Sequence, residues 1–349
     1  MAKSKKAMKI PVKNIYAMLA YAYPDLVNDQ LEGESNMFDS LDELLSEILL
    51  YGINRQLKRG LYKTYVGHEE NLTMIRGKID MHESIRLKTQ LSRQLHCTFD
   101  EFDKNNFYNQ VLKSTALLII RQGRVCQRKR KRLRDMLFFF HEIDEIQLRA
   151  IVWEDIRFHK DKIAYRSLIS LCYLIYNGVL EDEVTNQPYI TELAMSDLYG
   201  RFLQHFYLKE CPHLHLSYQG KSLASMQETA TGMKSALTVD MILSDQNIAC
   251  LYDYHYYDEL LEVGNEAENK QMIMDHMTKL IMGLKKLPRE SSAAGKKQYG
   301  VLLYPSLDEN YLEAYPLAGG SLYLGAINLR IPFDKIREEL IQVANLERA

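Results

Sequence analysis

The chain has 349 residues, of which 46% are hydrophobic and 26% charged, and its formal net charge is −2 at pH 7. This composition is that of an ordinary globular protein, and it excludes a disordered or fibrous chain. The length predicts two or three domains, and the small net charge means that any contact with nucleic acid must come from local basic patches.

The cysteines and the N-terminus indicate where the protein works. The five cysteines form no CxxC pair, which favours a reducing compartment over a disulfide framework. The basic N-terminus, MAKSKKAMKIPVKN, is not followed by the apolar stretch of a secretory signal, and no apolar run is long enough to span a bilayer. We therefore expect a cytoplasmic protein with no membrane partner.

The first half of the chain is predicted to be mostly helical. Apolar residues recur at helical spacing over residues 11–24, 39–58, 106–122, 128–143 and 165–180. Between the second and third of these helices, residues 62–79 read as short strands with a glycine at the bend. A polar stretch around 180–190 holds a proline and lacks periodicity, so we expect a domain boundary there, between residues 1–187 and 188–349.

The second half alternates between helices and strands. The predicted elements are a helix over 190–210, strands over 213–218, 237–244 and 248–257, a helix over 269–287, strands over 297–305 and 320–328, and a helix over 334–344. This order predicts an α/β (α+β) core, with a mixed sheet flanked by helices.

Two of these strands carry acidic residues that suggest a metal site. The strands LTVDMILS and IACLYDYHYY are joined by a tight polar turn, SDQN, and alternation places Asp253 and His255 on one face. If the register brings Asp240 opposite Asp253, two carboxylates converge in the way that Mg²⁺ sites use. Two surface aspartates on an edge strand would show the same spacing, so the pattern alone does not decide.

The whole chain resembles the McrC family, the nuclease subunit of modification-dependent McrBC-type restriction systems. The resemblance lies in blocks spread along the sequence. In chain order they are IPVKNIYAMLAYAY at 10–23, LLSEILLYGINRQLKRGLYKTYV at 44–66, MIRGKIDMHESI at 74–85, CTFDEFDKNNFYNQVLKSTALLI at 97–119, SLISLCYLIYNGVL at 167–180, MSDLYGRFLQHFY at 195–207, and TVDMILS followed by YDYHYY.

The resemblance implies a C-terminal PD-(D/E)xK nuclease domain that acts on double-stranded DNA with Mg²⁺ or Mn²⁺. It implies that Asp240 and Asp253 hold the metal. It also implies an N-terminal part that docks on a hexameric, McrB-like AAA+ GTPase and stimulates its hydrolysis. The sequence SYQGKSLAS contains Gly-Lys-Ser, but the glycine that a Walker A motif needs is replaced by His215, so we expect no nucleotide to bind to this chain.

The chain departs from the family pattern at the nuclease site. The family's Asp-x-Lys is here Asp253-Tyr254-His255, the glutamate of the helix that leads the nuclease domain is replaced by Gly200, and Lys279 stands where the following helix usually has a glutamine. Histidine has a reference pKa of about 6.5 against about 10.4 for lysine, so at pH 7 it is mostly neutral and does not replace a fixed cation. It can instead act as a general base, or bind a softer ion such as Mn²⁺ or Zn²⁺.

These departures leave two interpretations open. The first is an endonuclease subunit with Asp240, Asp253 and His255 as catalytic residues and with impaired cleavage. The second is a pseudonuclease that only activates the AAA+ partner. Lys279 could restore the missing charge if its side chain reaches the site, although helical lysines are commonly solvated.

The basic run RKRKRLR at 128–134 is also open to interpretation. It could bind DNA phosphates, form an acid-paired or solvated helix, or dock on an acidic partner surface.

Overall fold

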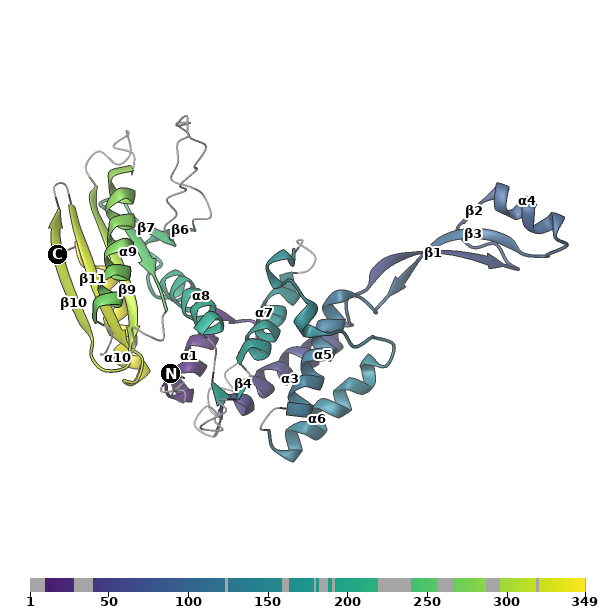
Figure 1. Cartoon of the computed structure of the whole chain (residues 1–349), viewed down its shortest axis with the longest axis horizontal. Helices are drawn as coiled ribbons and strands as arrows, with labels where there is room; N and C mark the ends of the chain where they lie inside the picture. Colours follow the sequence, from purple (N-terminus) through teal and green to yellow (C-terminus); the bar gives the residue numbers. More distant parts are fainter. Residues whose placement is uncertain are drawn as a thin grey trace. The chain divides into compact units, whose positions relative to one another are not determined.

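The computed structural model describes residues 10–27, 40–122, 125–158, 163–178, 180–181, 188–189, 192–218, 240–256, 266–286, 296–317 and 320–348. The chain forms two compact units (Figure 1). One, which we call the sheet unit, consists of Met1–Leu44 and Asn177–Ala349, and the other, the arm unit, of Leu45–Tyr176. The predicted division into functional domains at 187/188 stays a prediction, but the compact units do not follow it, because the first 44 residues belong to the sheet unit.

The sheet unit is built on a mixed six-stranded sheet with the strand order β10-β11-β9-β8-β7-β6. Strands β8, β9 and β11 run parallel to one another, and the other pairs are antiparallel. The bounds of the strands are β6 His215–Tyr218, β7 Met241–Ser244, β8 Ile248–Tyr254, β9 Lys297–Ser306, β10 Tyr311–Leu317 and β11 Gly320–Asn328. A separate antiparallel pair joins β4 (Leu180–Glu181) to β5 (Pro188–Tyr189). The predicted mixed sheet is confirmed.

Helices cover both faces of the sheet, as a sheet with central parallel strands requires. Its helices are α1 Val12–Ala22, α8 Glu192–Glu210, α9 Glu266–Lys286 and α10 Phe333–Ala344. Helix α9 buries Leu280 against Leu251 and Leu302 on one face (Figure 1). On the other face, the hydroxyl groups of Tyr207 in α8 and Tyr252 in β8 lie 2.8 Å apart. Side chains alternate along a strand, so Asp253, two residues after Leu251 in β8, lies on the same face as Leu251, the face that α9 covers.

Helix α1 is part of the sheet unit because buried contacts hold it there. It packs along α8, and Tyr21 contacts the rings of Phe202 and Phe206. Buried Asn14 donates from Nδ2 to the carbonyl oxygens of Leu329 (2.7 Å) and Ile331 (2.8 Å) in the turn before α10. The first helix of the chain and its last helix therefore belong to one folded core.

The arm unit consists of helices and a long projecting ribbon. Its elements are α3 Leu41–Arg59, which begins in the sheet unit, β1 Thr64–Leu72, β2 Lys78–Ile79, α4 Met81–Thr89, β3 Leu95–Asp103, α5 Phe107–Gln122, α6 Gln127–Leu137 and α7 Ile163–Gly178. Short 3₁₀ turns span Phe138–Phe140, Leu148–Ala150 and Trp153–Asp155. The predicted helices and the short strands predicted over residues 62–79 are present, the latter as β1 and β2, whereas α4, β3 and, in the sheet unit, β10 were not predicted.

The projecting ribbon, which we call the arm, consists of β1, β2, α4 and β3 (Figure 1). Strands β1 and β3 pair antiparallel without a break, from Thr64 opposite Asp103 to Leu72 opposite Leu95. The bend predicted at the glycine holds, because Gly77 has φ +66° and any Cβ there would lie 2.4 Å from the carbonyl oxygen of Thr98. The side chain of Asp80 caps α4 by accepting from the backbone N–H groups of His82 and Glu83.

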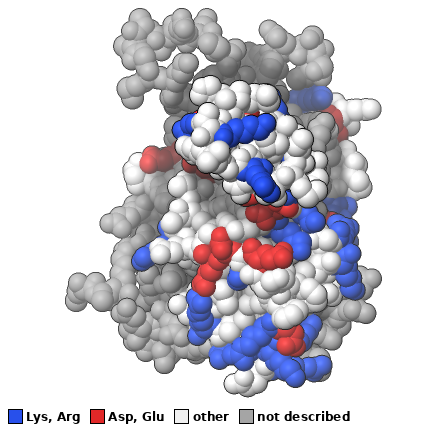
Figure 2. All heavy atoms as spheres, turned by 90° about the vertical axis from the view of Figure 1, so that its right-hand side faces the viewer, with Lys and Arg blue, Asp and Glu red and all other residues white. Residues whose placement is uncertain are grey.

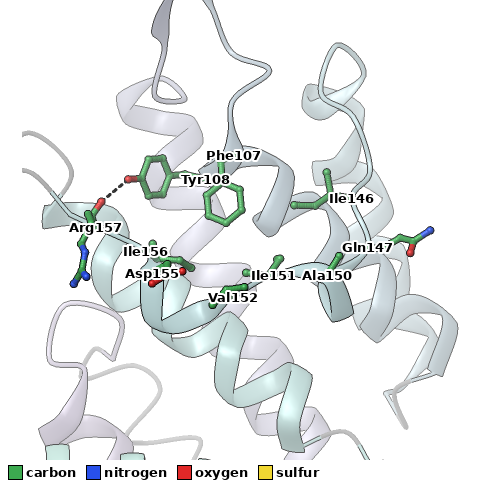
Figure 3. Close-up of a pocket in the computed structure, with 10 residues that line it drawn as sticks. All are labelled: Phe107, Tyr108, Ile146, Gln147, Ala150, Ile151, Val152, Asp155, Ile156 and Arg157. Atoms are coloured by element: carbon green, nitrogen blue, oxygen red, sulfur yellow. Dashed lines mark hydrogen bonds between the residues drawn. The ribbon is translucent and has the colours of Figure 1, made fainter.

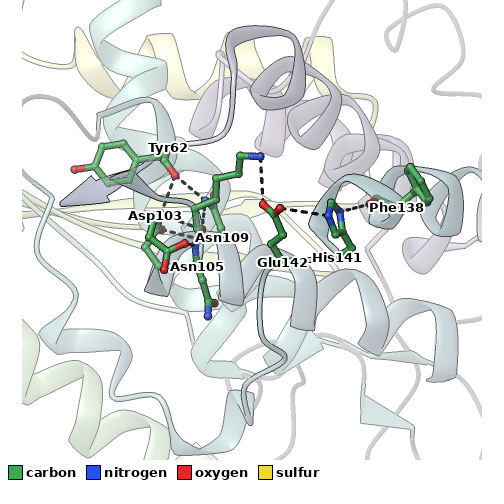
Figure 4. A network of polar contacts seen from close by, with 9 residues as sticks. Tyr62, Asp103, Asn105, Asn109, Phe138, His141 and Glu142 are labelled. Atoms are coloured by element: carbon green, nitrogen blue, oxygen red, sulfur yellow. Dashed lines mark hydrogen bonds and ion pairs between the residues drawn. The ribbon is translucent and has the colours of Figure 1, made fainter. Parts of the chain in front are cut away.

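A polar network fixes the base of the arm (Figure 4). The side-chain amides of Asn106 and Asn109 both donate to the carbonyl oxygens of Tyr62 and Lys104, at 2.8–3.2 Å. The Lys104 ammonium reaches Glu142, which in turn lies 3.4 Å from His141. The two strands of the arm thus leave the helical part of this unit from a hydrogen-bonded joint.

We predict that Asn14→Ala destabilises the protein by about 1–3 kcal/mol, because two buried carbonyl groups lose their donor. Urea unfolding followed by circular dichroism measures the change. Lys13→Ala, at the exposed neighbouring position, is the matched control. Equal stabilities of the two variants would show that the link between α1 and the turn before α10 is not needed.

Candidate metal centre

The hairpin of β7 and β8 brings the two predicted aspartates together. Met241 pairs with Tyr252, so Asp240, directly before β7, lies beside Asp253. The carboxylate of Asp240 accepts a 2.9 Å hydrogen bond from the backbone N–H of Tyr254. The turn predicted at SDQN is present, and its Asp245 accepts from the N–H groups of Asn247 and Ile248. Residues 237–239 and Tyr257, which the prediction included in these strands, lie outside the described residues.

Asp253 is the centre of the cluster. Its side chain is 0% exposed, and the imidazole of His255 and the ammonium group of Lys279 both contact it. The Nε2 atom of His255 lies 3.1 Å from Oδ2, and the Nζ atom of Lys279 in α9 lies 3.1 Å from Oδ1 and 3.3 Å from Oδ2. The structure therefore brings together Asp240, Asp253 and His255, as predicted, and adds Lys279, which the sequence left open.

Two further residues support His255, and the sequence did not identify them. The imidazole ring of His276 stacks on that of His255 with centroids 3.8 Å apart and planes 24° apart. Nδ1 of His276 lies 2.8 Å from the hydroxyl of Tyr304 in β9. His276 stands three residues before Lys279, so both lie on the face of α9 that covers Asp253. That spacing is the signal that could have identified His276.

Burial and neighbouring charges shift the pKa values of the two carboxyl groups in opposite directions. Burial, the charge of Asp253 and the hydrogen bond to it raise the pKa of Asp240 to about 7. Burial also acts to raise the pKa of Asp253, but hydrogen bonds with His255 and Asp240 and the charges of His255 and Lys279 outweigh it and lower this pKa to about 2. Burial and the charge of His255 lower the pKa of His276 to about 4, so His276 is neutral at pH 7.

This arrangement suits a divalent cation. One ligand atom each from Asp240, Asp253 and His255 lies within 4.8 Å of the other two. Two adjacent carboxylates, one of them fully buried, are costly without a compensating positive charge, in agreement with the raised pKa of Asp240. The donor set of two carboxylates and one imidazole therefore fits a metal ion at this end of the sheet.

Gly200, where the resemblance implies a glutamate, contacts the same hairpin from α8. A Cβ at this position would lie 2.6 Å from the Cε2 atom of the Tyr254 ring. The hydroxyl of Tyr254 accepts a 2.6 Å hydrogen bond from Nε2 of Gln204, one turn further along α8. The tyrosine between the two metal-site residues thus occupies the space that a side chain at position 200 would need.

The basic run forms α6, and one of its cationic groups binds an acid group of another helix. Arg132 binds both carboxylate oxygens of Glu47, at 2.8 and 3.0 Å, and Leu133 is buried. Arg128, Lys131 and Arg134 are exposed, and the 75% exposed Phe138 follows the helix. Figure 2 shows Lys and Arg gathered at the lower end of the face it presents, the height at which α6 lies in Figure 1. The partner of this surface stays a prediction.

A pocket of about 460 Å³ lies in the arm unit and not at the metal centre. Phe107 and Tyr108 from the start of α5 form one side of it, and residues from 146–157 form the other (Figure 3). Its lining is mainly apolar, and the hydroxyl of Tyr108 is already bound to the carbonyl oxygen of Arg157 at 2.7 Å. No set of converging polar groups in this pocket suggests chemistry.

A family model described as the McrBC 5-methylcytosine restriction system component matches residues 3–273. The chain belongs to this family. It is 24% identical over 344 residues to the type IV methyl-directed restriction enzyme EcoKMcrBC of Escherichia coli, with 96% of this chain and 97% of that protein covered. The family membership that the sequence blocks predicted is therefore confirmed.

Solved structures confirm the fold. The chain matches, at 18% identity and a TM-score of 0.50, a chain in the half-complex of a tetradecameric assembly of Thermococcus gammatolerans McrB AAA+ hexamers with bound McrC. The match covers 95% of this chain and 76% of that chain. Among the described residues of this McrBC family member, no helix combines the length and apolar character needed to cross a bilayer.

We predict that Asp240→Asn raises the free energy of unfolding of the metal-free chain more at pH 8 than at pH 5. The difference between the two effects should be on the order of 1–3 kcal/mol. The folded-state pKa of about 7 lies above the unfolded value of about 3.9, so this group's contribution to wild-type stability falls as pH rises from about 4 to about 7. The asparagine of the variant does not titrate, and its side-chain oxygen can still accept the hydrogen bond from the backbone N–H of Tyr254. Urea unfolding in chelator at both pH values measures the difference, and a pH-independent difference would contradict the raised pKa.

Proposed function

We propose that this chain is the nuclease subunit of a McrBC-type restriction complex that cuts DNA carrying modified cytosine. Asp240 and Asp253 would hold a divalent ion, Mg²⁺ or Mn²⁺, at the end of the sheet. The single observation that carries the proposal is the contact of the Lys279 ammonium with the buried Asp253 carboxylate. The chain's family membership and its full-length similarity to a methyl-directed restriction enzyme support the proposal.

Lys279 provides the positive charge that the substitution of the strand lysine by His255 removed. The family's lysine would lie at position 255 on the face of β8 that carries Asp253, and Lys279 reaches this carboxylate from α9. A divalent ion bound here supplies Lewis-acid stabilisation of the charge that develops on a phosphodiester. Lys279 would orient its ammonium hydrogens toward the phosphate oxygens and add a second positive charge. The expected impairment of cleavage rested in part on the loss of this charge and in part on the replacement of the helix glutamate by Gly200.

A second candidate function is a pseudonuclease that only activates the AAA+ partner. One observation favours it: Asp253 is already contacted by both Lys279 and His255. These contacts satisfy the carboxylate without a metal, so a metal ion must compete with them. The two candidates differ in whether DNA is cut, not in the partner.

We propose that the arm docks on the AAA+ partner. Apolar side chains near its far end face solvent, including Met74 (80% exposed), Ile75 (66%) and Leu91 (93%). The small sheet of β1, β3 and β2 has little core of its own, and clustered exposed apolar groups mark interaction sites. The McrC of T. gammatolerans is bound to McrB AAA+ hexamers, which supports a partner of this class.

We further propose that the exposed face of α6 contacts the DNA backbone. Arg128, Lys131 and Arg134 are exposed along α6, and the exposed ring of Phe138 follows this helix. Such a surface attracts phosphates with little dependence on sequence. This is the first of the interpretations that the basic run allowed, and it places the phosphate contact in the arm unit.

We predict that, in complex with the AAA+ partner and with GTP and Mg²⁺ or Mn²⁺, the chain cuts plasmid carrying 5-methylcytosine. Asp253→Asn abolishes cutting, because a metal ligand is lost. Lys279→Gln reduces it by about 10²-fold, within the range measured for single groups that stabilise transition-state charge. Lys279→Arg keeps the charge and retains more activity than Lys279→Gln. Strand breaks and phosphate release are measured in the same tube.

Phosphate release is the control for assembly in this experiment. If the wild-type chain stimulates GTP hydrolysis but leaves the plasmid intact with either metal, the pseudonuclease function is correct and the nuclease proposal is wrong. If Lys279→Gln cuts as fast as the wild type, the charge comes from another group.

We predict that the double variant Met74→Asp/Ile75→Asp loses stimulation of the partner's GTP hydrolysis by at least tenfold. Two charges would replace apolar groups at the docking surface, whereas the fold, which does not bury these side chains, should keep its melting temperature. Leu208→Asp, at an exposed apolar position on α8, is the matched control. Stimulation by the arm variant equal to that by the control would refute docking through the arm.

A further inference from the structure

The imidazole of His255 is held in place toward the two carboxylates. It stacks on His276 at 3.8 Å, and His276 is itself fixed by its 2.8 Å contact with Tyr304. The edge of the His255 ring that carries Nε2 points at Asp253, 3.1 Å from Oδ2. A ring that merely replaced a lysine would need no such support. The arrangement is that of a nitrogen ligand whose direction is set by its neighbours.

The spacing of the donor atoms agrees with a shared metal ion. Two ligand atoms that each lie about 2.1–2.2 Å from a metal, at right angles, are about 3 Å apart. Nε2 of His255 and Oδ2 of Asp253 are 3.1 Å apart, and one oxygen of Asp240 completes a set within 4.8 Å. An ion bound between these atoms would replace the hydrogen bond that joins His255 and Asp253. No large movement of the backbone is required.

We propose that His255 is a metal ligand through Nε2, and that the set Asp240, Asp253 and His255 selects Mn²⁺ over Mg²⁺. This inference rests on the proposed function for the position of the site and adds the identity of the ion. Imidazole binds Mg²⁺ poorly because this ion prefers oxygen ligands, whereas transition-metal ions accept mixed nitrogen and oxygen sets. Two carboxylates with one imidazole form a mixed oxygen and nitrogen set, which Mn²⁺ accepts more readily than Mg²⁺ does.

The proposal gives each substituted position a separate role. Lys279 takes over the positive charge, because its ammonium contacts Asp253 from α9. His255, released from that role, supplies a ligand that lysine cannot offer while protonated. His276 is a positioning residue that holds the ring of His255 by stacking. For ligation, the proton of His255 must lie on Nδ1, so that Nε2 offers its lone pair.

The test is metal binding to the full chain, freed of metal by chelator and measured without DNA. Isothermal titration with Mn²⁺ and with Mg²⁺ gives both affinities, and the loss of the free Mn²⁺ electron paramagnetic signal gives an independent value for Mn²⁺. We expect the wild type to bind Mn²⁺ at least tenfold more tightly than Mg²⁺. His255→Lys, which restores the family's residue, should lose at least tenfold in Mn²⁺ affinity and change Mg²⁺ affinity by less than threefold.

Variants of His276 test the positioning role. His276→Phe keeps a ring to stack on His255 and should retain Mn²⁺ affinity within threefold. His276→Ala removes the ring and should weaken Mn²⁺ binding several-fold, with Mg²⁺ affinity unchanged. Melting temperatures in chelator confirm that each variant is folded, and the wild-type preference is measured whether or not a variant folds.

The proposal is overturned if the wild type binds the two ions within threefold of each other, if it binds neither, or if His255→Lys keeps the Mn²⁺ affinity. These outcomes are separate from those of the cleavage experiment. A chain that prefers Mn²⁺ through His255 but never cuts DNA supports this inference and refutes the nuclease function. A chain that cuts DNA and binds both ions equally supports the nuclease function and refutes this inference.

Discussion

The arrangement of the metal centre depends on one constraint: a carboxylate that is buried must be neutralised. Asp253 is fully buried at the end of β8, and its low pKa means that it remains charged. The hydrogen bond to His255 and the ion pair with Lys279 provide the neutralisation. Asp240 meets the same constraint in the opposite way, through a raised pKa. Helix α9, which packs on the sheet through Leu280, contributes both Lys279 and His276 to the surroundings of this carboxylate.

The sequence predicted the hairpin and its acidic pair because these depend on local rules. Alternation along β8 and the turn SDQN determine which residues face one another. The sequence did not predict β10, whose side chains are almost all exposed and show no alternation. It also left Lys279 undecided, because the reach of a helical side chain depends on how α9 packs on the sheet. His276 and Tyr304 come from different elements, and only the fold brings them together.

The two compact units differ in how they are stabilised. The sheet unit has an extensively packed core, whereas the arm unit carries an exposed extension. In the sheet unit, the chain's first helix and last helix are joined through Asn14, so residues distant in sequence stabilise one sheet. In the arm unit, a network of polar contacts around Asn106 and Asn109 lies at the base of the arm. Its far end has few buried groups and many exposed apolar ones. The proposed metal site thus lies in the unit with the larger sheet, and the proposed docking surface lies in the unit with the exposed extension.

The contact between Gly200 and Tyr254 affects how this chain could change over time. A larger residue at position 200 would collide with the tyrosine ring, which Gln204 also holds by a hydrogen bond. A side chain at position 200 therefore requires the Tyr254 ring to move, and the hydrogen bond from Gln204 opposes that movement. Positions 200 and 254 are thus energetically coupled, and a larger residue at 200 should cost less stability when the residue at 254 is smaller.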